Sequence, residues 1–243
     1  MSENIKEAIA YGVELASREE KIITVDAKHY YDNSKANLVE LEPKLYPDVL
    51  ELCTLDSLVD YLKSGLNNTS YQRLMVIVES PTQVSVYTED DEKAVRTRLV
   101  SVEARIPSIQ YGYYMSSTDF NVYLQSKFED TDDRDVVLNF ASALKIDNGS
   151  EIVDNGVSQT TTVKTGVANL AKAKAPNPVM LRPYRTFAEV EQPASQFVFR
   201  IDKNAEMALF SADGGKWRLE AINNVANYLK AQLAEQSNIT ILA

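Results

Sequence analysis

Apolar side chains recur at helical spacing in several parts of the chain, and this spacing predicts its helices. The first predicted helix covers residues 3–17. A second helix is predicted to start at Thr54 and to end at Gly65, because glycine readily adopts the left-handed conformation of a helix C-terminus. Ser117 or Thr118 is predicted to cap a third helix and Asp132 or Asp133 a fourth, and residues 212–217 lead into a last helix that includes Trp217.

Alternating or β-branched apolar runs between turn residues predict the strands. Two such runs, 73–79 and 83–88, flank Ser80-Pro81-Thr82 and form an expected hairpin, with 94–104 as a third antiparallel strand. The remaining predicted strands are 22–25, a short one near 38–41, 179–187, 196–202, 206–211 and 239–242. Residues 166–178 are rich in small side chains and are predicted as a linker.

Asn155-Gly156 carries the strongest turn signal, because both residues suit the positive φ angles of a two-residue type I′ turn. Its flanks are β-branched but hold few large apolar side chains. We therefore predict a hairpin near 150–165 that projects from the core and is available for contact between subunits.

Strands and helices are segregated along the chain, which favours an α+β fold with an antiparallel sheet and packed helices over a parallel doubly wound fold. We expect two parts. Residues 1–49 form an N-terminal helix and an extended segment, and residues 50–243 form the main α+β domain, which is long enough to bury a core without disulfides or metal.

The chain has one His and one Cys, and this scarcity excludes most familiar catalytic and metal sites. Cys53 lies in a strand-like run and is expected to be buried, while His29 is expected to face solvent or an interface. No catalytic set stands out, so we expect a protein that is not an enzyme and needs no cofactor or metal. The apolar runs are too short to span a bilayer, and the N-terminus does not read as a signal peptide, so no membrane partner is expected.

Charge is distributed unevenly along the chain. From Asn155 to Ala188 there is no Asp or Glu, although the formal net charge of the whole chain is −10. Acidic residues gather elsewhere, notably in the run 129–135. Separate basic and acidic segments can bind a polyanion or other copies of the same protein. The residues predicted to lie at such an interface are Asn155, Gly156, Lys164, Lys172, Lys174, Asp132 and Asp133.

Arg182 and Arg185 form the densest cationic patch, and with Tyr184 they can hold phosphates or pair with acidic side chains. Arg200, on a neighbouring predicted strand, can lie opposite either arginine. Lys216 completes the set of predicted ligand-binding residues, for a phosphate or an acidic partner.

Three further segments each admit two interpretations. Asp213-Gly-Gly-Lys216 can bind an anion at a helix start, or it is a tight strand-to-helix turn with Asp213 as the cap and Trp217 in the core. The acidic run at 129–135 suits a capped helix start better than a metal site. Glu189 and Glu191 with Lys203 or Lys216 match no nuclease spacing that we recognise.

Four segments resemble the YfdQ-like family of phage and prophage proteins, a domain of unknown function. They are residues 118–128, 154–159, 182–187 and 212–217. The resemblance implies a phage or prophage origin, and with it a location in the cytoplasm of a bacterial host. It implies no activity and no site residues.

Three functional hypotheses follow. The first is a non-catalytic phage protein that assembles into a homo-oligomer with a structural or scaffold role, with a shell as the extreme form. The second is an early phage protein that binds nucleic acid or a nucleotide, which the acidic net charge disfavours. The third is a metal-dependent hydrolase that uses carboxylates.

Overall fold

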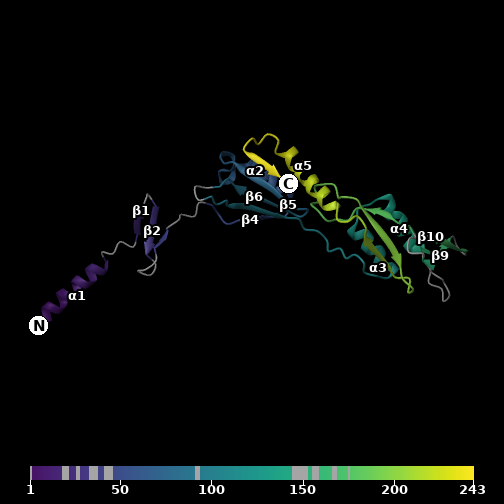
Figure 1. Ribbon diagram of the computed structural model, residues 1–243, viewed down its shortest axis with the longest axis horizontal. Helices are drawn as coiled ribbons and strands as arrows, with labels where there is room; N and C mark the ends of the chain where they lie inside the picture. Colours follow the sequence, from purple (N-terminus) through teal and green to yellow (C-terminus); the bar gives the residue numbers. More distant parts are fainter. Residues whose placement is uncertain are drawn as a thin grey trace. The chain divides into compact units, whose positions relative to one another are not determined.

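The computed structural model divides the chain into two units, Met1–Pro47 and Asp48–Ala243, and Figure 1 labels the helices and several of the strands. It describes residues 2–17, 22–25, 28–32, 38–40, 46–90, 94–143, 153–154, 159–165, 169–174 and 176–243. Helices pack against largely antiparallel sheets, so the predicted α+β class is confirmed.

The N-terminal unit holds one helix and a small antiparallel sheet. Its elements are α1 (Ser2–Ser17), β1 (Ile22–Val25), β2 (Lys28–Asp32) and β3 (Leu38–Glu40). The strands pair in the order β1-β2-β3, and β2 was not predicted because its sequence shows no apolar period. None of the described side chains in this unit is buried.

The second unit contains a five-stranded sheet with the order β14-β5-β6-β7-β4. Its strands are β4 (Leu50–Leu52), β5 (Leu74–Ser80), β6 (Gln83–Thr88), β7 (Arg98–Glu103) and β14 (Ile239–Leu242). The predicted hairpin of β5 and β6 is confirmed, and β7 follows antiparallel but is shorter than predicted. Both edge strands pair in parallel, so β6 alone runs against the other four.

Two helices cover one face of this sheet: α2 (Leu55–Ser64) and α5 (Trp217–Gln232). A short 3-10 helix (Leu66–Tyr71) follows α2. The predicted ends of α2 are confirmed, since Thr54 Oγ1 accepts a hydrogen bond from the Ser57 N–H at 3.2 Å and Gly65 has φ 70°. α2 connects β4 to β5, which run in the same direction, and such strands cannot be joined by a tight turn. α5 directly precedes β14, which pairs in parallel with β5.

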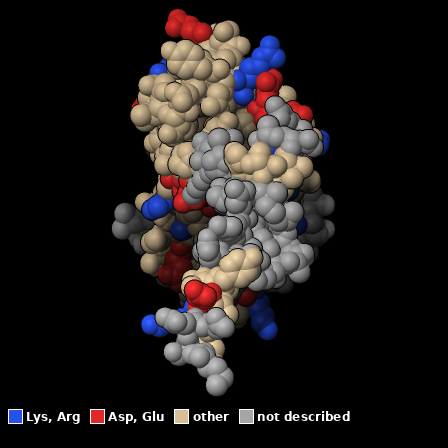
Figure 2. Space-filling model, turned by 90° about the vertical axis from the view of Figure 1, so that its left-hand side faces the viewer, with Lys and Arg blue, Asp and Glu red and all other residues tan. Residues whose placement is uncertain are grey.

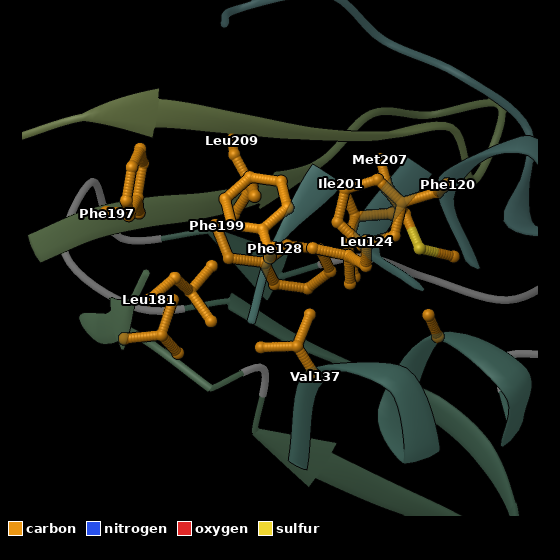
Figure 3. Close-up of a cluster of buried hydrophobic side chains, with 12 residues drawn as sticks. Phe120, Leu124, Phe128, Val137, Leu181, Phe197, Phe199, Ile201, Met207 and Leu209 are labelled. Atoms are coloured by element: carbon orange, nitrogen blue, oxygen red, sulfur yellow. The ribbon is translucent and has the colours of Figure 1, made fainter. Parts of the chain in front are cut away.

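The second unit also contains a helix layer on a second sheet: α3 (Ser117–Lys127) and α4 (Asp132–Ala143) pack on a three-stranded antiparallel sheet. Its strands are β11 (Val179–Leu181), β12 (Ser195–Ile201) and β13 (Met207–Ser211). Figure 3 shows the aromatic core between them, in which the Phe120 and Phe199 rings lie 5.5 Å apart and Phe128 meets Phe197 at 6.1 Å. These rings fix the helices on the sheet through their large buried area.

Some predicted ends in this layer are wrong by a short distance. The helix caps are Ser116 and Thr131, because their hydroxyls accept the N–H groups of Asp119 at 3.2 Å and Arg134 at 3.3 Å. β11 ends at Leu181 rather than near 187, because the chain after it pairs with residues 127–129 instead.

A third sheet has the order β10-β9-β8, from β8 (Val153–Asp154), β9 (Gln159–Thr165) and β10 (Asn169–Lys174). The predicted two-residue turn is wrong, because Asp154 pairs with Gln159 and four residues separate them. The predicted linker is also wrong, because β10 pairs along its whole length with β9. Asn155 and Gly156 lie outside the described residues.

The buried side chain of Gln159 ties β9 to the end of β12. Its Nε2 donates to the Ile201 carbonyl at 3.0 Å, and its Oε1 accepts the Ile201 N–H at 2.9 Å. The side-chain amide thereby makes the two backbone hydrogen bonds with Ile201 that a neighbouring strand would otherwise make.

We expect Gln159→Ala to lower the free energy of unfolding by about 2 kcal/mol, because it leaves two buried backbone groups without partners. Urea denaturation followed by circular dichroism measures this loss. Gln125→Ala removes the same side chain from an exposed position on α3 and serves as the matched control. Equal stabilities of the two variants would contradict the role of Gln159.

Candidate functional site

Arg182, the first candidate ligand-binding residue, pairs with acids of its own chain. Its Nη1 donates to Glu191 Oε1 and lies 3.9 Å from Glu129 Oε2. The hydrogen bond with Glu191 raises the pKa of Arg182, while burial raises the pKa of Glu129 against the influence of Arg182. Of the two roles that the sequence allowed for Arg182, pairing with acidic side chains is therefore the one that the structure shows, and the acids belong to the same chain.

Arg200 and Lys216 do not join Arg182. The register of β12 places Arg200 opposite Ala208 of β13, so it lies opposite neither Arg182 nor Arg185. Lys216 is exposed and directly precedes α5. Arg182 and Arg200 thus lie apart, whereas Lys216 directly precedes Trp217, the residue on which Arg185 stacks.

Arg185 is buried, with only 4% of its surface exposed, at the start of α5. Its Nη2 donates to Ser195 Oγ and to the Pro193 carbonyl at 3.3 Å. Its Cζ lies 4.0 Å from the centroid of the Trp217 ring, in cation–π contact. Burial lowers the pKa of Arg185. A side-chain hydrogen bond with Tyr111 and the negative charge of Asp213 favour its charged form.

Asp213 is the anionic group of this cluster. Its Oδ2 accepts from Ser195 Oγ, and its Oδ1 accepts the Gly215 N–H at 3.0 Å and Ser211 Oγ at 3.2 Å. Burial acts to raise the pKa of Asp213, but these hydrogen bonds outweigh it and hold the pKa below its usual value.

The turn before α5 has the tight geometry that its two glycines predicted, with φ 64° at Gly214 and 82° at Gly215. The predicted helix cap is wrong, since Asp213 closes the turn and the residue at the cap, Lys216, makes no side-chain capping bond. Trp217 is half-buried rather than part of the core.

Two members of the cluster were missed by the sequence analysis. Arg218 is exposed, and its Cζ lies 5.1 Å from the Trp217 ring centroid. Tyr111, 37% exposed, interacts with Arg185 electrostatically and through a side-chain hydrogen bond, and burial raises the pKa of Tyr111. The sequence offers no signal for Tyr111, whereas the position of Arg218 beside Trp217 could have suggested a second stacked cation.

A cavity of about 310 Å³ lies beside the same segment, on the side of Tyr184 and Thr186. Cys53 lines it and accepts a hydrogen bond from Arg105 Nε at 3.2 Å. The predicted burial of Cys53 is wrong, because it follows an edge strand and is exposed. The lining is mainly apolar, and we find no nucleophile with an adjacent general base in it.

Among the residues that the structure describes, the glutamates considered for a hydrolase site make separate contacts. Glu189 Oε1 accepts the N–H of Leu55 at 2.7 Å at the start of α2, and Glu191 is paired with Arg182. No group of three or more His, Cys, Asp or Glu side chains suited to a metal occurs within the described ranges. His29 is exposed, as predicted, with Nδ1 2.9 Å from Thr24 Oγ1.

The predicted interface residues occupy three places. Asp132 is exposed at the start of α4, and Asp133 Oδ2 accepts the Met180 N–H at 2.7 Å. Lys164 lies on β9, and Lys172 and Lys174 lie on β10. Both basic and acidic side chains are visible among the described residues in Figure 2.

No family model, no curated protein and no solved structure matches the chain. In the described part of the chain, no helix combines the length and apolar character needed to cross a bilayer.

We expect Asp213→Asn to lower the free energy of unfolding at pH 7 by about 1 kcal/mol, the difference between charge-assisted and neutral hydrogen bonds. Because the folded-state pKa is depressed, the carboxylate stabilises the protein above its unfolded-state pKa and loses this effect as the pH falls through the folded-state pKa. The gap in Tm between parent and variant should therefore narrow below roughly pH 4.

Thermal denaturation between roughly pH 3 and pH 8 measures this gap. Asp90→Asn is the control, since Asp90 is exposed and lies 4.0 Å from Arg96. A gap for Asp213→Asn that stays constant to the lowest pH would contradict the assignment.

Proposed function

We propose that the protein is a non-catalytic protein that assembles with copies of itself in a structural or scaffold role. The single observation that carries this proposal is the exposed apolar face of α1. Ile5, Ile9 and Val13 are 62%, 62% and 64% exposed. The resemblance to YfdQ-like proteins supports a phage or prophage origin and, with it, the cytoplasm of a bacterial host.

The described side chains of the N-terminal unit bury too little apolar surface to stabilise it on their own. Helices of about 12–15 residues are marginal in water, and a small sheet needs a hydrophobic face packed on something. Burial of each large side chain on α1 would contribute about 1.5–3 kcal/mol. A partner surface that covers this face would therefore stabilise the whole unit.

The apolar face of α1 is complementary to itself. Ile5, Ile9 and Val13 are equally spaced, so a two-fold axis at Ile9 places Ile5 against the partner's Val13. A side chain added at Gly12 would meet no atom within 4 Å, so this side of the helix is open to close approach. In antiparallel packing, the partial positive N-terminus of each helix also lies beside the partial negative C-terminus of the other, and these opposite charges attract.

We expect Ile9→Glu to dissociate the assembly, because it places a charge at the centre of the apolar contact. Light scattering at micromolar concentration should give the parent a mass of at least twice 27.2 kDa and the variant a mass near 27.2 kDa. Ala10→Glu introduces the same charge at the exposed neighbouring position, outside the stripe, and should keep the parent's mass. A monomeric parent, or a variant with the parent's mass, would refute the proposal.

We also expect added salt to preserve the assembly. Copies with a net charge of −10 repel one another, and salt screens this repulsion without weakening an apolar contact. The same light-scattering measurement from about 0.05 to 1 M NaCl tests this expectation. Dissociation at high salt would show instead that paired basic and acidic segments hold the copies together.

A further inference from the structure

A cavity of about 410 Å³ lies between the first two turns of α3 and the chain that leads into this helix. Its volume falls in the range of small-molecule sites, roughly 300–1,000 Å³. Two aromatic rings, a thioether and three polar side chains line it: Tyr113, Tyr123, Met115, Ser108, Gln110 and Asp119. The proposed assembly through α1 makes no use of this cavity.

Hydrogen bonds and ring contacts hold the walls of the cavity in place. Tyr123 Oη donates to the Gln110 carbonyl at 2.9 Å, and the Tyr123 ring centroid lies 5.4 Å from that of Phe128 in the aromatic core. Met115 is joined to Met207 of β13 by two backbone hydrogen bonds of 3.0 and 2.9 Å. The cavity is therefore formed before a ligand arrives, which reduces the cost of ordering on binding.

The charge of the lining favours a cation. Asp119 carries the only formal charge among the described residues that line the cavity, and it is exposed. Its Oδ2 accepts one hydrogen bond, from Ser116 Oγ at 2.8 Å, and a carboxylate can accept several more. Burial raises the pKa of Tyr123, so its hydroxyl stays neutral at pH 7. A cation would meet an opposite charge here, and an anion would be repelled.

Tyr113 offers an aromatic ring that the fold itself leaves uncovered. It is 62% exposed, whereas the ring of the next residue, Tyr114, packs edge-on against Phe210 with the centroids 6.2 Å apart. The face of an aromatic ring carries partial negative charge and attracts cations. A cation with an alkyl surface would therefore gain from the ring both electrostatically and by removing apolar surface from water.

We propose that this cavity binds an alkylammonium group, with Tyr113 and Tyr123 against its alkyl surface and Asp119 against its charge. Aromatic side chains are the means by which proteins recognise choline and methylated lysine. The carboxylate adds a Coulomb attraction. Quaternary amines and lysine side chains both present this chemistry, and the proposal does not depend on assembly through α1.

Isothermal titration calorimetry at constant ionic strength tests the proposal, with choline and n-butylammonium as the cations. The uncharged isostere of choline, in which carbon replaces nitrogen, is the ligand control. Tyr113→Leu should weaken choline binding roughly fivefold, because it removes one ring from the cation. The exposed position of Tyr113 lets this variant fold, and Tyr71→Leu, at a tyrosine that is 90% exposed elsewhere, should bind as the parent does.

Asp119→Asn should weaken choline binding by a similar factor, because it removes the charge but keeps a side-chain oxygen for Ser116. Tighter binding of choline assigns the cavity to quaternary amines, and tighter binding of butylammonium assigns it to primary amines such as lysine side chains. Equal binding of both assigns it to alkylammonium groups of either kind. No saturable binding of either cation, equal binding of the uncharged isostere, or an unchanged affinity of Tyr113→Leu would overturn the proposal.

Discussion

Buried backbone has to find hydrogen-bond partners away from water, and the second unit meets this constraint with side-chain amides. Gln192 Oε1 accepts the N–H groups of Arg185 at 2.9 Å and Thr186 at 3.2 Å, and its Nε2 donates to the Phe187 carbonyl at 3.0 Å. The segment between β11 and β12 can therefore be buried without being a strand. The same amide fixes the backbone at Arg185, whose side chain reaches Ser195 and the Trp217 ring.

The charges of the chain are balanced in space more closely than along the sequence. Arg182 belongs to a long stretch without acids, yet it pairs with Glu191 from just beyond that stretch and lies near Glu129. The acidic run in turn supplies Asp133 to a backbone N–H of β11. A basic segment thus need not be a basic surface, because the fold brings distant acids to it.

The sequence predicted those features that depend on a few adjacent residues. Thr54 and Gly65 mark the ends of α2 because capping is a local matter of hydroxyl and φ angle. The predictions from sequence were wrong where contacts between separate segments determine the structure. Residues 169–174 have the composition of a linker but form a strand, because they pair with β9. In the candidate site, the glycine turn was predicted, whereas Tyr111 and Ser195 come from other elements and leave no local signal.

The amide of Gln159 has a consequence for cooperativity. It joins the sheet of β8, β9 and β10 to Ile201 through a pair of hydrogen bonds, without a continuous strand ladder. Elements held in this way open as separate units at a free energy below that of global unfolding. The amide hydrogen of Ile201 would then exchange with solvent whenever that sheet detaches, while the aromatic core beneath it stays closed.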